Sequence, residues 1–182
     1  MRNYVIINGF MMNKNSVNFA SNVVKGRIAE TLIEEMFKKS GYQVYRFGYE
    51  RLLENICQLK QELVDSSTFE RIRSIPDFLV VDPEGNVQLI EVKYRSSGEI
   101  LPEELKKYAY FWEEARIILV TPKEPHFRIS YIKRFCEDGK LYNLQNDKFT
   151  KIHPEIIREF SRVVQRYFGK GSNNGGKMNK EF

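Results

Sequence analysis

Residues 75–95, Ile-Pro-Asp-Phe-Leu-Val-Val-Asp-Pro-Glu-Gly-Asn-Val-Gln-Leu-Ile-Glu-Val-Lys-Tyr-Arg, decide the fold of this 182-residue chain. The stretch contains two runs rich in apolar and β-branched residues, 78–81 and 87–92, separated by the turn-forming cluster Asp-Pro-Glu-Gly-Asn at 82–86. Two such runs on either side of a glycine-containing turn predict a β-hairpin.

Charged side chains stand at one end of this hairpin. Asp77 opens the first strand, and Glu91 and Lys93 lie two residues apart in the second, so the alternation of a strand directs both toward one face. Antiparallel pairing across the turn returns Asp77 to the side of Glu91. Unpaired charge is costly to remove from water, so we expect a binding partner to offset the charges of this group. Two carboxylates with room for water suit Mg²⁺, and a neighbouring lysine can hold or activate the attacking water.

Pro76-Asp77 followed by Glu91-Val92-Lys93 resembles the PD-(D/E)xK nuclease superfamily, the restriction-endonuclease-like fold of many restriction enzymes, Holliday junction resolvases and repair exonucleases. In that family a preceding helix supplies a further acidic residue, and Glu30 stands at the matching place. The resemblance covers residues 18–133. It implies an α/β fold with a mixed central sheet flanked by helices.

The resemblance also implies an activity, that of a Mg²⁺-dependent deoxyribonuclease with Mn²⁺ as a substitute. Asp77 and Glu91 are then expected to bind the metal together with the Val92 carbonyl, and Glu30 to act through water or on a second ion. Lys93 is expected to position or deprotonate the attacking water, for which burial or other cations must lower its pKa. The residues expected to contact DNA are Lys25, Arg27, Tyr94, Arg95, Tyr108, Arg71 and Arg73.

Several of these positions have a plainer alternative. Lys25 and Arg27 are either phosphate contacts or solvated cations, and Arg71 and Arg73 either line the approach to the site or fix a linker to the body. Tyr108 suits a core position on an amphipathic helix. Glu104 precedes it by four residues, where a RecB-like branch of the family carries glutamine, so membership of that branch stays open.

The remaining elements follow from hydrophobic periodicity and from helix start and stop signals. A helix over 49–65 is expected between the first strand and the Pro-Asp strand, whereas the smallest relatives turn directly from one of these strands into the other. The expected elements are a helix over 16–40 ended by Gly41, a strand over 42–47, an inserted helix over 49–65 before the Pro-Asp strand, a polar linker at 66–68, a helix over 101–114 with Pro102 in its first turn, a strand over 116–121, an edge strand over 127–132 and a last amphipathic helix over 154–168.

The composition favours one domain over residues 1–168 and a flexible basic tail over 169–182. Residues 1–15 are an N-terminal extension, for which there are two alternatives: either Tyr4–Ile7 is a small edge strand, or the protein starts at Met11 or Met12. The formal charge of +5 suits a polyanionic partner. His126 and His153 are expected on the surface. Two distant cysteines without a Cys-x-x-Cys spacing predict reduced thiols and a cytoplasmic protein. The N-terminal apolar run is too short for a membrane span.

Three functional hypotheses remain open at this point. The first is a DNA endonuclease or exonuclease acting in repair, recombination or defence, as a homodimer because duplexes have two strands to cut, or with a partner protein. The second is a catalytically inactive nuclease-fold module for nucleic-acid binding or assembly. The third treats Asp77, Glu91 and Lys93 as a structural ion pair in an unrelated α/β protein.

Overall fold

The computed structural model describes residues 4–7, 10–47 and 67–169, with side-chain environments for 18–47 and 67–169. The helix expected at 49–65 and all but the first residue of the expected tail lie outside the described residues.

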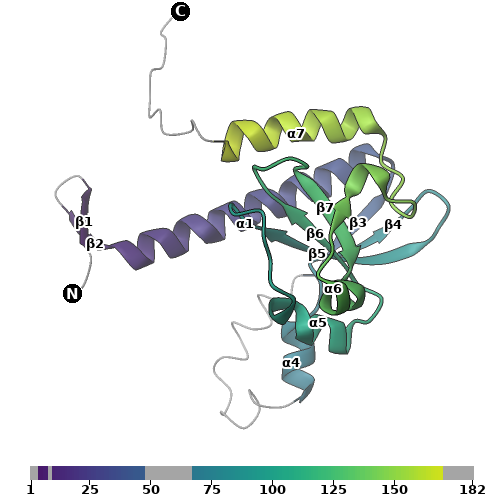
Figure 1. Cartoon of the computed structure of the whole chain (residues 1–182), viewed down its shortest axis with the longest axis horizontal. Coiled ribbons are helices and arrows are strands. Elements are labelled where there is room, and N and C mark those ends of the chain that lie inside the picture. The colour runs from purple at the N-terminus through teal and green to yellow at the C-terminus, as the bar shows by residue number, and fades with distance from the viewer. Residues whose placement is uncertain (1–3, 8–9, 48–66, 170–182) are drawn as a thin grey trace, which may run out of the picture.

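A six-stranded mixed sheet forms the centre of the molecule, in the order β3-β4-β5-β6-β7-β8 (Figure 1). The hairpin β4–β5 is antiparallel, β5 and β6 run parallel, and the other neighbours are antiparallel. The α/β class with a mixed sheet flanked by helices is therefore confirmed. The strands are β3 (Gln43–Arg46), β4 (Phe78–Val81), β5 (Val87–Tyr94), β6 (Arg116–Val120), β7 (Phe127–Tyr131) and β8 (Tyr142–Asn143).

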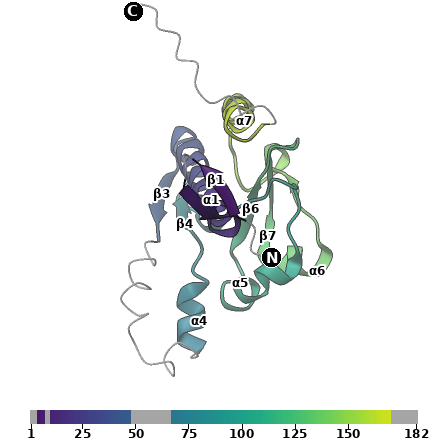
Figure 2. The same cartoon turned by 90° about the vertical axis from the view of Figure 1, so that its left-hand side faces the viewer.

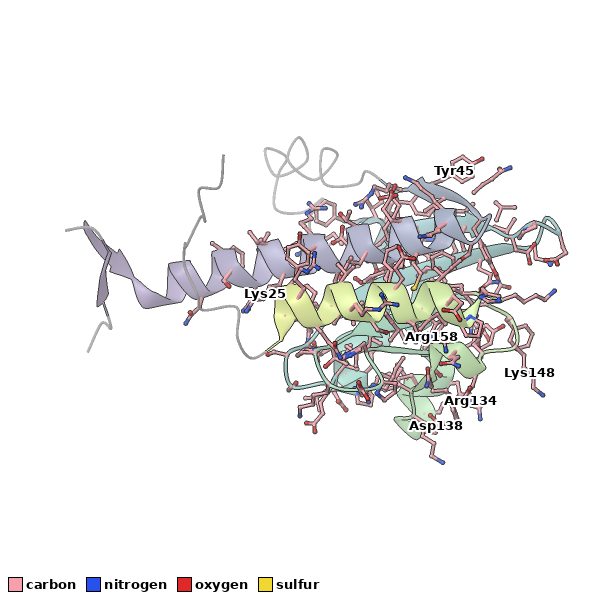
Figure 3. The ribbon with its side chains drawn as sticks, turned by 90° about the horizontal axis from the view of Figure 1, so that it is seen from above. Lys25, Tyr45, Arg134, Asp138, Lys148 and Arg158 are labelled. Atoms are coloured by element: carbon pink, nitrogen blue, oxygen red, sulfur yellow. The ribbon has the colours of Figure 1, made fainter. Side chains whose placement is uncertain are left out.

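Helices cover both faces of this sheet. The long α1 and the C-terminal α7 lie side by side over one face, as the view from above shows (Figure 3), and α5 and α6 cover the other (Figure 1). The helical elements are α1 (Lys14–Lys39), α4 (Ser67–Arg73), η1 (Pro102–Leu105), α5 (Lys106–Phe111), α6 (Ile132–Asp138), η2 (Leu144–Asn146) and α7 (Pro154–Phe168). No helix among the described residues is both long and apolar enough to cross a membrane.

The first half of α1 projects from the body (Figures 1 and 2). The small hairpin of β1 (Tyr4–Ile7) and β2 (Phe10–Asn13) directly precedes α1 in the chain and lies at its projecting end. The residues Tyr4–Ile7 thus form a strand, one of the two alternatives for this region. They pair with β2 in a two-stranded sheet that is separate from the central one.

The two faces of β5 meet different cores, because side chains alternate along a strand. Ile90 and Val92 pack with α1 and α7, whereas Leu89 packs with α5 and α6. Glu91 and Lys93 lie two and four residues after Leu89, so their side chains leave the strand on the same face as Leu89, the face that α5 covers. The turn that sets this register is closed by Asp82, whose carboxylate accepts bonds from the backbone and side-chain amides of Asn86, with Gly85 at φ +89°.

Three sequence predictions about local structure are wrong. Residues 67 and 68 of the linker expected at 66–68 open α4 instead, a helix that buries Phe69, and residue 66 lies outside the described residues. The helix expected to reach residue 114 ends at Phe111, because the Trp112 backbone leaves the helical region at φ −137°, ψ 62°. The strand β7 is not at the sheet edge, since the short β8 pairs with it.

A fourth wrong prediction concerns His126, which is buried instead of lying on the surface. Its Nδ1 lies 3.1 Å from the Thr121 carbonyl and its Nε2 lies 3.2 Å from the Gln165 amide of α7. His153 is exposed as expected and caps the start of α7.

Candidate active site

The strand register places Asp77 opposite Glu91, one step beyond the pair Phe78 and Ile90. The Val92 backbone N–H donates to Asp77 Oδ2 at 2.8 Å, which fixes the carboxyl against β5. Burial raises the pKa of Asp77 well above its ordinary value of 3.8, and the neighbouring Glu91 raises it further. The Val92 N–H and the Lys93 ammonium oppose this shift without cancelling it. Burial and the neighbouring Glu91 thus both disfavour the charged form of the Asp77 carboxyl.

Glu91 and Lys93 form an ion pair at the end of β5. Glu91 is buried, with 2% of its side chain exposed, and its Oε1 accepts a hydrogen bond from Lys93 Nζ. Its second oxygen, Oε2, is buried without a hydrogen-bond partner among the described residues. Burying a carboxylate oxygen without a hydrogen-bond donor costs free energy of folding. Glu91 Oε2 is therefore the atom of this group best suited to bind a cation or a water.

Tyr108 of α5 supports the lysine. Lys93 Nζ lies 5.3 Å from the centre of the Tyr108 ring, within the range of a cation–π contact, and 26% of the Lys93 side chain stays exposed. The Tyr108 side chain itself is buried. The structure therefore places this residue beneath Lys93 as part of the core, where it contacts a candidate catalytic group.

Glu30 approaches the same place from α1. It shares a hollow of about 370 Å³ with Val92, Lys93 and residues 94–96 at the end of β5. Its negative charge makes a smaller contribution to the raised pKa of Asp77 than burial and Glu91 do. Its own Oε2 accepts contacts from Arg46 at 3.2 Å and Arg27 at 3.3 Å.

Arg46 is a site residue that the sequence reasoning missed. It lies on β3 opposite Phe78, next to Asp77, and its guanidinium binds Glu30 and, at 2.6 Å, Glu34. Lys38 also binds Glu34, at 2.7 Å. The one-turn spacing of Glu30 and Glu34 predicts a shared orientation, but only the pairing of β3 with β4 brings an arginine to meet both.

Tyr94 and Arg95 line the hollow of Glu30. Each is also held by the protein. The Tyr94 ring lies 4.4 Å from that of Phe168, and the Arg95 guanidinium binds the Tyr94 carbonyl at 2.9 Å and the Glu104 carboxylate. Burial alone would raise the pKa of Glu104, but its bonds to the Leu101 N–H and Arg95 hold it below the ordinary value.

The arginines of α4 are engaged in fixing that helix. The Arg71 guanidinium lies 5.4 Å from the centre of the Trp112 ring, and Arg73 contacts Glu70 at 3.5 Å and the Phe69 ring at 5.5 Å. The hollow at the end of β5 is lined by neither of them. Arg71 thus joins α4 to the body, which is the plainer alternative, whereas these contacts of Arg73 lie within its own helix. Lys25 lies on α1 close to where the helix leaves the body (Figure 3).

The donor set suits a small hard cation with few protein ligands. Among residues 18–47 and 67–169, no three acidic, histidine or cysteine side chains are arranged to hold a metal ion. Two carboxylates, Asp77 and Glu91, do stand together, and one of their oxygens is unpartnered. Mg²⁺ keeps several of its waters and takes one or two protein carboxylates, so this pair fits it without a third side chain.

No family model, curated protein or solved structure matches the chain.

Proposed function

We propose that the chain is a metal-dependent deoxyribonuclease of the PD-(D/E)xK type that hydrolyses phosphodiester bonds in DNA with Mg²⁺ or Mn²⁺. One observation carries the proposal: Asp77 is held against the Val92 N–H beside the Glu91–Lys93 ion pair, where Glu91 Oε2 has no hydrogen-bond partner in the described part of the chain. A purely structural ion pair gains nothing from a second buried carboxylate, because that carboxylate raises the electrostatic cost of the first.

Each residue of the group has a separate task in this reaction. Asp77 and Glu91 hold the cation, which when bound polarises the scissile phosphate and offsets its negative charge. Lys93 lines the hollow, and its ammonium is held by Glu91 and the Tyr108 ring, from where it would orient a water and stabilise charge that develops on phosphate oxygens. Glu30 faces the same hollow and orients water from the α1 side.

The test of this function is a cleavage assay over a panel of labelled DNAs comprising plasmid, linear duplex, single strand, flap and four-way junction. The expected result is cleavage with Mg²⁺ or Mn²⁺ and none with EDTA, and the preferred substrate distinguishes an endonuclease from an exonuclease. Binding of these DNAs without cleavage in any metal would instead support an inactive nuclease-fold module.

Metal binding is expected to stabilise the wild-type protein and not the Asp77→Asn variant. A ligand at a hundred times its Kd adds about 2.7 kcal/mol to the free energy of unfolding, which raises Tm by about 5–10 °C in a domain of this size. Asparagine keeps the volume of Asp77 and an oxygen for the Val92 N–H but removes the charge. Thermal unfolding with increasing Mn²⁺ measures this. An equal shift in both proteins would place the metal elsewhere.

Arg46→Gln is expected to tighten metal binding. The variant removes a cation from Glu30, and the loss of one nearby unit charge changes the Coulomb energy by about 0.5–2 kcal/mol near protein surfaces, or roughly two- to thirtyfold in Kd. Lys38→Gln is the matched control, because Lys38 contacts Glu34 and Glu35 but not Glu30. Titration with Mn²⁺ monitored by calorimetry compares the two. Weaker binding by Arg46→Gln would mean that Arg46 orients Glu30 for the metal instead of competing with it.

A further inference from the structure

A second hollow lies at the far end of the sheet from the candidate active site. It has a volume of about 350 Å³, within the range of small-molecule sites. The strand register sets its place: Lys93 pairs with Leu119, whereas Arg116, which lines the hollow, pairs with Ile90 three residues earlier on β5. The hollow is therefore separate from the cleavage centre.

Three exposed aromatic side chains surround this hollow, namely Tyr131 at the end of β7, Tyr142 of β8 and Phe149 after η2. Phe149 is 59% exposed. Its ring lies 6.0 Å from that of Tyr131 at 73°. The two rings thus present an apolar corner to solvent.

A buried arginine holds this corner in place. Arg116 is almost fully buried, and its guanidinium binds Asp147 at 2.5 Å and Thr150 at 2.7 Å. The same guanidinium lies 4.9 Å from the Tyr131 ring and 5.8 Å from the Phe149 ring. Its Nε has no hydrogen-bond partner among the described residues. The aromatic rings are therefore ordered before any ligand arrives, which lowers the entropic cost of binding.

Cations border the aromatic corner. Arg134 of α6 binds the Tyr142 hydroxyl at 3.0 Å, and its guanidinium lies 5.2 Å from the Tyr142 ring. Lys148 is exposed next to Phe149 in the chain. Figure 3 shows Arg134 and Lys148 at the end of the molecule opposite the projecting start of α1. Aromatic faces next to cations are the combination that binds single-stranded nucleic acids, since bases stack on rings while the cations attract phosphates.

We propose that this hollow binds single-stranded nucleic acid, with a base stacked on Phe149 and Tyr131 and the backbone phosphates near Lys148 and Arg134. This inference rests on the proposed function in taking nucleic acid as the substrate, and it adds a subsite remote from the cut. A strand long enough to reach both places is held at two points, so long single strands or single-stranded tails bind more tightly than short ones.

The test measures binding of a fluorescein-labelled thymidine 20-mer to the full chain by anisotropy, in EDTA so that no cleavage intervenes. Stacking of one base contributes about 1–3 kcal/mol, so Phe149→Ala is expected to weaken Kd about tenfold. Phe149→Trp is expected to retain wild-type affinity because it keeps an aromatic face. Tyr110→Ala is the matched control, since Tyr110 is 81% exposed on α5 and lies outside the hollow.

Three outcomes would overturn the inference: no binding of the 20-mer by the wild type, wild-type affinity in Phe149→Ala, or an equal loss in Phe149→Ala and Tyr110→Ala. Thermal unfolding of each variant checks that the fold is retained. Cleavage is measured separately, which keeps the two proposals distinct. DNA cleavage with unchanged binding by Phe149→Ala would refute the subsite alone, whereas Phe149-dependent binding without cleavage would support the subsite and refute the nuclease.

Discussion

Lys93→Ala is expected to abolish detectable metal-dependent DNA cleavage, with a loss of about 10²–10⁴-fold in the single-turnover rate. The variant removes the ammonium that is held by Glu91 and the Tyr108 ring. It also leaves the buried Glu91 without its cation, so thermal unfolding is measured alongside to show that the variant is folded at the assay temperature. Glu91→Gln, which keeps the side-chain volume but loses the charge, is expected to give a comparable loss because it weakens the cation site.

The control for this experiment is Lys133→Ala on α6, since Lys133 pairs with Glu113 on the surface and lies outside the hollow of Lys93. It is expected to cleave at the wild-type rate. Purification of all proteins by the same route excludes a contaminating nuclease, because only the Lys93 and Glu91 variants should then be inactive. Full activity of Lys93→Ala in a folded protein would remove the proposed function.

The hairpin and the approach of Asp77 to Glu91 were predictable from sequence, because they depend on local signals. A five-residue turn with glycine sets the register of β4 and β5, and the register alone brings the two carboxylates together. The last helix, residues 154–168, has the predicted bounds for a similar reason, since proline opens it and the apolar stripe runs to its end. Each of these features needs only neighbouring residues.

Several features that sequence reasoning missed depend on contacts distant in the chain. Arg46 becomes a site residue only because β3 pairs with β4, thirty-two positions later. His126 is buried because Gln165 of α7 reaches it. The expected edge strand β7 is covered by β8, a two-residue strand too short for any periodicity. Tyr108 was predictable as a core residue, but its contact with Lys93 was not.

Arg116→Met is expected to lower the free energy of unfolding by about 3–5 kcal/mol, the usual cost of leaving one member of a buried ion pair alone. The side chains of Arg116 and Asp147 are 3% and 12% exposed, and the guanidinium also binds Gln88 and Thr150. Arg158→Met is the control, because its pair with Glu155 is exposed and contributes less than about 1 kcal/mol. Urea unfolding at neutral pH measures both.

The Arg116–Asp147 ion pair also predicts how the loss of stability in Arg116→Met depends on pH. Burial alone would raise the pKa of Asp147, but its bonds to Arg116 and Thr150 hold it below the ordinary value of 3.8. A carboxyl with a lowered folded pKa contributes its full stability above the unfolded value and loses it as the pH falls through the folded pKa. The difference between wild type and Arg116→Met should therefore be constant near neutrality and shrink below about pH 4. A difference that grows in acid would mean that Asp147 is not stabilised by Arg116, and the buried pair could not then be what orders Tyr131 and Phe149.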